Sequence, residues 1–275
     1  PGGDPADWRR WTGEAYLEAS SADAAGVART FPVGTAAPAS ARGDFKAWLE
    51  FDAGRAVRLD LKAALRDLDW PLSPGSLRLA EVDAELSAAR TGAGHEIRIQ
   101  RLRMRDAAGL GLDALGEQRL RLDDAWLPVA GRIAAAPFDV EEALRFARGL
   151  PLDREVLARL GALGATGRIT AASGQWDRAA AMRFEAAIDF EALSMRYVPG
   201  GPSREAALPW FDKLSGEARI RHSGGELRVR ASDATLAFPG IFAQPAIPLR
   251  TVTANASWTV GAAGRPEAAP GSDAR

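Results

Sequence analysis

Two acidic pairs could support acid–base chemistry in this chain. Asp123–Asp124 and Glu141–Glu142 each place two carboxyl groups side by side, and paired carboxyl groups can act as general acid and general base. Adjacent residues of a strand point to opposite faces, so Asp123 and Asp124 are not expected to converge on one substrate. Glu141 and Glu142 follow a predicted N-cap at Asp139, where negative charge stabilises the helix itself. Both pairs have structural explanations, so we predict no catalytic residue.

Metal and cofactor chemistry has few candidate ligands. The chain contains no cysteine, and its two histidines, His95 and His222, are far apart in the sequence. The glycine-rich runs "GALGATG" and "GLGLDALG" lack the Gly-Lys-Ser/Thr sequence and the strand–helix setting of a phosphate-binding loop. We therefore predict no metal site and no cofactor.

Charge and length narrow the class of protein. Thirty-five basic residues balance 36 acidic ones, for a net charge of −1, which argues against nucleic acid as the main partner because phosphate binding usually requires a basic excess. The 275 residues can bury a core as one domain or two. No apolar run approaches the roughly 18 residues of a membrane-spanning helix. The chain begins at Pro1 rather than at methionine, which we interpret as an internal fragment of a longer protein.

The elements that position these residues are mostly predicted β-strands, because apolar and polar residues alternate with period two. In "FKAWLEF" and "AVRLDLKA", one face of each strand is apolar, and Ala53–Gly54 between them is typical of a hairpin turn. Trp48 is out of phase with its apolar neighbours and is predicted to lie on the polar face. The apolar residues of these two strands are Phe45, Leu49, Phe51, Val57, Leu59 and Leu61.

The same alternation continues after a helical region. "AMRFEAAIDF" and "GEARIRHSGGELRVR" are apolar on one face and charged on the other, and the second contains a Ser-Gly-Gly turn. Before the helical region, phase slips after Leu79 and after Ile99 predict bulges. After the helical region, the apolar face includes Met182, Phe184, Ile188, Phe190, Ala218, Ile220, Leu227, Val229, Leu236 and Phe238.

Helix signals separate the strands into regions. Asp139 begins one predicted helix that ends near Gly149, and a second begins at Asp153. We therefore predict antiparallel hairpins over 1–130, a helical insertion over 131–166, further strands over 167–260, and a disordered tail or linker over 261–275.

An ordered series of motifs in the last third of the chain resembles the YhdP branch of the AsmA-like envelope proteins. The series runs from Leu208 to Trp258 through "FDKLSG", the turn "SGGELRV", "LAFPGIF", "PAIPL" and a closing "ASW". The helical run "FDVEEALRFARGLPLDREVLARLGALGATGRI" resembles the helix-rich insertion of the same proteins. Residues 9–130 match only through their hairpin pattern.

The resemblance implies a mainly β fold: an elongated, twisted antiparallel sheet curled into an apolar groove, with a few short helices inserted. It implies a segment of a protein that spans the periplasm of a Gram-negative bacterium, is anchored in the inner membrane, and carries phospholipids toward the outer membrane to support its permeability barrier. Its partners would be phospholipids and the two membranes, with no nucleic acid. The family has no catalytic residues, so the expected site is the apolar face formed by the sixteen residues given above, as a groove lining.

A second interpretation stays open. Alternating strands also form ordinary sandwiches, in which the apolar face meets another sheet or a helix. The chain would then be a non-catalytic structural or interaction protein of the envelope with a closed core. Strand pattern alone does not separate lipid from protein as the occupant of that face.

Overall fold

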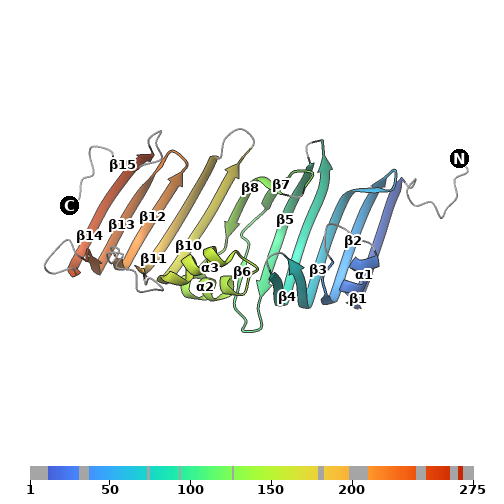
Figure 1. The fold of residues 1–275 in the computed structure, drawn as a ribbon, viewed down its shortest axis with the longest axis horizontal. Helices are drawn as coiled ribbons and strands as arrows, with labels where there is room; N and C mark the ends of the chain where they lie inside the picture. Colours follow the sequence, from blue (N-terminus) through green and yellow to red (C-terminus); the bar gives the residue numbers. More distant parts are fainter. Residues whose placement is uncertain are drawn as a thin grey trace, which may run out of the picture. The chain divides into compact units, whose positions relative to one another are not determined.

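The computed structural model describes residues 12–30, 37–72, 75–92, 94–125, 127–178, 183–197, 210–239, 246–260 and 266–268. The chain divides into two compact units, the first comprising 1–133 and 149–151 and the second 134–148 and 152–275. Both units are antiparallel sheets with few short helices (Figure 1).

The first unit is a meander in which nearly every strand pairs with its neighbours in the sequence. Its strand order is β1-β2-β3-β4-β5-β7-β8, and β6 pairs with β5. The strands are β1 (Gly13–Asp23), β2 (Ser40–Asp52), β3 (Arg55–Leu72), β4 (Gly75–Thr91), β5 (Gly94–Arg105), β6 (Gly111–Asp113), β7 (Gln118–Leu122) and β8 (Pro128–Ala135). The short helix α1 (Ala24–Thr30) follows β1 and contacts β2.

The second unit repeats this design. Its strand order is β10-β11-β12-β13-β14-β15, and β9 pairs with β10. The strands are β9 (Phe138–Asp139), β10 (Leu163–Asp177), β11 (Arg183–Tyr197), β12 (Trp210–Arg221), β13 (Gly224–Ala237), β14 (Ala246–Val260) and β15 (Pro266–Ala268). Strand β15 lies inside the segment for which the sequence predicted a tail or linker, and it pairs with β14.

The predicted fold class is confirmed. The described residues are mainly β, the pairings are antiparallel, and no pairing between described strands closes the sheet of either unit on itself. The predicted hairpin at Ser223 is present, since β12 ends at Arg221 and β13 begins at Gly224. The predicted slip after Ile99 is also present, because Gln100 is an extra residue opposite the Glu85–Leu86 step of β4. The slip predicted after Leu79 produces no register shift between β3 and β4.

The helices begin where the sequence predicted. The carboxylate of Asp139 accepts hydrogen bonds from the backbone N–H groups of Glu141 (3.0 Å) and Glu142 (3.2 Å) at the start of α2 (Val140–Arg148). Asp153 likewise accepts a bond from the N–H of Glu155 at 2.8 Å before α3 (Arg154–Ala162). Each carboxylate satisfies N–H groups that a helix start leaves unpaired. Helix α2 packs on β10 and buries Phe146, which is 1 % exposed.

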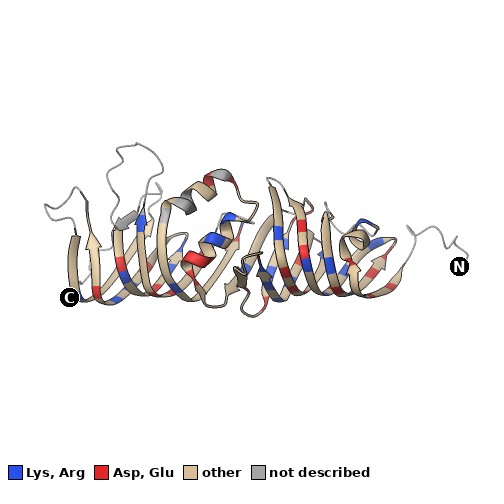
Figure 2. Cartoon of the chain, turned by 90° about the horizontal axis from the view of Figure 1, so that it is seen from below, with Lys and Arg blue, Asp and Glu red and all other residues tan. Residues whose placement is uncertain are grey.

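Each unit bends its strands at residues with left-handed backbone geometry. In the second unit these are Gly167, Ala192, Lys213 and Asp233 on β10 to β13, with φ of 114°, 47°, 60° and 54°. The pairing register shifts beside Gly167, Ala192 and Lys213. Beside Ala192, β11 has one residue more than either neighbouring strand, and beside Lys213, β12 has one residue more than β11. A bulge of this kind bends a strand and increases its twist. Figure 2 shows the strands of each unit curving along their length.

Side chains of neighbouring strands satisfy the backbone groups that the bends release. The N–H of Ala192 donates to the Ser215 hydroxyl, and the N–H of Lys213 donates to the Ser194 hydroxyl, both at 3.0 Å. In the first unit, the N–H of Ser21 donates to Asp44 at 2.8 Å. Buried or strained backbone donors are costly when unpaired. These hydroxyls and carboxylates therefore stabilise the bends.

Candidate functional site

The apolar face of the first unit is built by β2 and β3. Antiparallel register places Leu49 opposite Leu59, and Ala47 opposite Leu61. Strand β4 continues one row, because Leu61 is also opposite Leu86. These are the cross-strand pairs that stabilise a sheet, with side chains close enough to pack.

The six residues predicted for this face all belong to it by alternation, and most are only partly buried. Phe45 is buried at 7 % exposure. The others are of intermediate exposure: Leu49, Phe51, Val57, Leu59 and Leu61. Val57 lies at a register shift between β2 and β3.

The second unit has a corresponding face on β11, β12 and β13. One row runs from Ile188 through Ala218 to Leu227, and register pairs each with the next. The adjacent row runs from Phe190 to Val229 with Gly216 between them. A Cβ on Gly216 would lie 2.0 Å from the backbone oxygen of Arg228. Glycine is therefore required for the strands to approach at this point.

Of the ten residues predicted for this face, nine are described and Met182 lies outside the described residues. Ile220 is opposite Ala186, and Leu236 is opposite Phe211, so the face extends along both ends of the row. Phe238 follows β13 directly and is partly buried.

Burial along the second face is graded from the bend outward. Phe190, close to the bend, is 7 % exposed, whereas Phe184, six positions earlier on the same face of β11, is 39 % exposed. The buried cluster consists of Ile169, Phe190, Leu214 and Ala234, which all lie within two residues of a bend residue. The bend therefore forms the core of this unit, and the strand segments away from it keep apolar surface accessible.

In the first unit, the face of the sheet opposite the apolar one is polar and carries ion pairs between neighbouring strands. Lys46 contacts Glu18 and Lys62 contacts Glu85, each at 2.7 Å, between residues that are directly opposite in register. Figure 2 shows basic and acidic residues distributed along the strands of both units. The predicted position of Trp48 on this face is confirmed, because it is 41 % exposed and its ring packs against Tyr16 at 5.0 Å between centroids.

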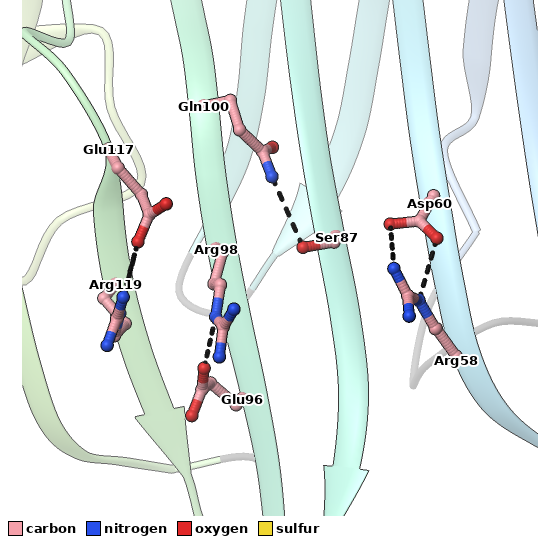
Figure 3. A network of polar contacts seen from close by, with 8 residues as sticks. All are labelled: Arg58, Asp60, Ser87, Glu96, Arg98, Gln100, Glu117 and Arg119. Atoms are coloured by element: carbon pink, nitrogen blue, oxygen red, sulfur yellow. Dashed lines mark hydrogen bonds and ion pairs between the residues drawn. The ribbon is translucent and has the colours of Figure 1, made fainter.

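Ion pairs between residues two apart in the sequence add to this face; two lie within single strands, and in the third Glu117 directly precedes β7. Figure 3 shows Arg58 with Asp60, Arg98 with Glu96, and Arg119 with Glu117, each pair two residues apart and hence on one face. The arginine side chains of these pairs are about half exposed. Exposed pairs of this kind contribute little stability. Their main effect is to keep one side of the sheet solvated.

Two residues considered for acid–base or metal chemistry, Asp123 and His222, both lie in turns. Asp123 lies in a turn after β7, so its predicted position in a strand is wrong. It accepts hydrogen bonds from the backbone N–H groups of Ala125 and Leu127, both at 2.9 Å. His222 is exposed in the β12–β13 turn. Within the described residues, no three His, Cys, Asp or Glu side chains are grouped as metal ligands would be.

Sequence reasoning missed the residues of the bends. Ile169, Leu214 and Ala234 are buried, yet they were not among the predicted face residues. The signal that could have located them is an interruption of the alternation. In "FDKLSG", for example, Phe211 and Leu214 are both apolar although three positions apart.

No helix in the described part of the chain has the length and apolar character needed to cross a membrane. No curated protein and no solved structure matches the chain. The family model described as "YhdP protein" matches residues 3–268, which is most of the sequence. The chain therefore belongs to the YhdP family.

Proposed function

We propose that this chain is a segment of a periplasm-spanning phospholipid-transfer protein that supports lipid homeostasis and the permeability barrier of the outer membrane. Membership of the YhdP family supports a role in the bacterial envelope. The observation that carries the proposal is the partly exposed apolar face of each unit, backed by a solvated polar face. No catalytic step is part of this function.

In this proposal the acyl chains lie on the apolar face and the head groups stay in water. Removing one CH₂ group from water is worth about 0.8 kcal/mol. A lipid tail therefore gains binding free energy from contact area alone, without a specific polar partner. Because such attraction has no direction, a tail can move from one row of side chains to the next at little cost.

The bends divide this face into a buried part close to the bend and a more exposed part away from it. Buried side chains such as Phe190 and Leu214 hold the strands together at the bend. Farther along β11, Phe184 is exposed, and Ile188 is partly buried against the cluster. The sixteen predicted face residues are the proposed groove lining. Parts of the parent protein outside this chain would reach the inner and outer membranes.

The alternative function is a structural or interaction protein whose apolar face is covered by protein. A closed sandwich requires a second sheet on that face. Within each unit the described strands form one hydrogen-bonded layer, and the other described elements are the short helices α1, α2 and α3. This arrangement favours the lipid-binding function over the closed core.

Native mass spectrometry of protein purified from Gram-negative cells tests the proposal. We expect phospholipid to remain bound, and Phe184→Asp combined with Ile188→Asp to remove it, because charges on the face disfavour acyl chains. The matched control is Trp48→Asp, which changes an aromatic residue of similar exposure (41 % against 39 %) on a polar face. Lipid-free wild-type protein, or equal lipid loss in the control, would contradict the proposed function.

A further inference from the structure

A cavity of about 600 Å³ lies on the polar face of the second unit, at the bend of β11 to β14. Its lining contains two basic side chains, four hydroxyl side chains and no acidic residue. The residues are Ala192, Lys213, Ser215, Arg230, Ala231, Ser232, Thr251, Val252 and Thr253. The polar side chains of the cavity lie on the face opposite the apolar one, because they alternate with apolar residues along each strand. Two of those apolar residues, Ala231 and Val252, pack against the buried cluster at the bend.

Strand register brings the polar groups into two adjacent rows. Arg230 is directly opposite Ser215 on one side and Thr253 on the other. Ser232 is opposite Thr251 in the next row. Neighbouring strands are about 4.8 Å apart, so the row from β12 to β14 spans roughly 10 Å. Donors at this spacing can surround one small anion.

The hydroxyl of Ser215 is already oriented by the bend. It accepts a hydrogen bond from the N–H of Ala192 at 3.0 Å. With its oxygen engaged in this way, its hydrogen can be donated to a ligand in the cavity. Ser232, Thr251 and Thr253 add hydroxyl donors from two further strands.

The two basic side chains of the cavity differ from neighbouring arginines, which form ion pairs with a carboxylate. On the same face of β12 and β13, Arg228 contacts Glu217 at 2.8 Å, and Arg221 contacts Glu185 at 3.2 Å. Within the described residues, neither Lys213 nor Arg230 forms an ion pair, although both are exposed. Their positive charges are therefore available to bind an anion.

We propose that this cavity binds a phosphate group. The fork of the Arg230 guanidinium matches phosphate oxygens geometrically, Lys213 supplies a second charge, and the hydroxyls donate the remaining hydrogen bonds. The chemistry is shared by free phosphate, a soluble phosphate ester and a phospholipid head group. The proposal does not depend on lipid tails binding the apolar face.

Isothermal titration calorimetry at low ionic strength tests the site with inorganic phosphate and with sn-glycerol 3-phosphate. Low salt is needed because exposed charges are screened. We expect saturable binding that weakens about tenfold or more in Arg230→Gln and in Lys213→Gln, as hydrogen bonds to charged groups are strong. Arg230→Lys should retain part of the affinity, because it keeps the charge but loses the fork.

The matched control is Arg219→Gln, which removes one positive charge from the same face of β12 outside the cavity. Circular dichroism of every variant shows whether the sheet is retained. Flotation with phosphatidylglycerol vesicles, compared with phosphatidylcholine vesicles, separates the sources. Arg230-dependent flotation identifies a head group, and calorimetric binding without flotation identifies a soluble phosphate. Absence of binding in both assays, or an equal loss in Arg219→Gln, would overturn the proposal.

Discussion

Two phenylalanines on one face of β11 are expected to contribute very differently to stability. Phe190 is 7 % exposed and belongs to the buried cluster at the bend, whereas Phe184 is 39 % exposed. Truncation of a buried phenylalanine leaves a cavity and typically costs about 3–5 kcal/mol. For Phe184 the surrounding contacts are incomplete, so we expect a loss of about 1–2 kcal/mol.

Urea unfolding followed by circular dichroism measures this difference. With a slope of about 1–3 kcal/mol per M, a gap of about 2 kcal/mol separates the two midpoints by roughly 1 M. Phe190→Ala should have the lowest midpoint, and the midpoint of Phe184→Ala should lie between those of Phe190→Ala and the wild type. Phe184→Leu serves as a control that changes shape while keeping most of the apolar area.

Equal midpoints for the two alanine variants would refute this reasoning. A stronger effect of Phe184→Ala would show that the outer part of the face is a packed core. It would then favour a protein occupant for that face. A slope that changes in one variant alone would indicate that its denatured or native state has changed in compactness.

Three further predictions concern the strands and helices. Gly43→Ala should destabilise the protein by about 1–3 kcal/mol in urea unfolding, because φ is 148° and a Cβ would lie 2.1 Å from a backbone oxygen; Gly13→Ala, with φ of 151° but open space, should cost less. Arg105, by hydrogen bonding, holds the pKa of Asp113 below its ordinary value. The stabilisation from this pair is therefore full above the unfolded pKa of Asp113 and is lost as pH falls through its folded pKa, so Asp113→Asn should flatten the dependence of the urea midpoint on acidic pH. Asp139→Ala should cost about 1 kcal/mol by thermal unfolding, whereas Asp139→Ser, which keeps a cap, should cost less.

The alternation of residue types was sufficient to predict most of the long strands and their faces, but not the end of β7 at Leu122 or the short strand β15. Phe45 and Leu49 face the apolar side and Trp48 the polar side, because a strand turns successive side chains to opposite faces. Helix starts at Asp139 and Asp153 were predictable for a similar reason, since capping depends on a local side chain.

The bends could not be predicted in the same way. Left-handed backbone geometry at Ala192 and Lys213 has no local signal, because neither residue type favours it. It is stabilised by hydroxyl groups of neighbouring strands, which sequence alone does not bring together. Burial was also beyond local reasoning: Phe184 and Phe190 are equivalent in the pattern, and only the bend makes one of them core.

Site-specific photocrosslinking in living Gram-negative cells tests the central claim most directly. A photoreactive phenylalanine derivative would replace Phe184 on the apolar face or Trp48 on the polar face, two positions of similar exposure. The proposed function predicts phospholipid adducts at position 184 and few at position 48. Protein adducts at position 184 without lipid, or equal lipid labelling at both positions, would contradict it.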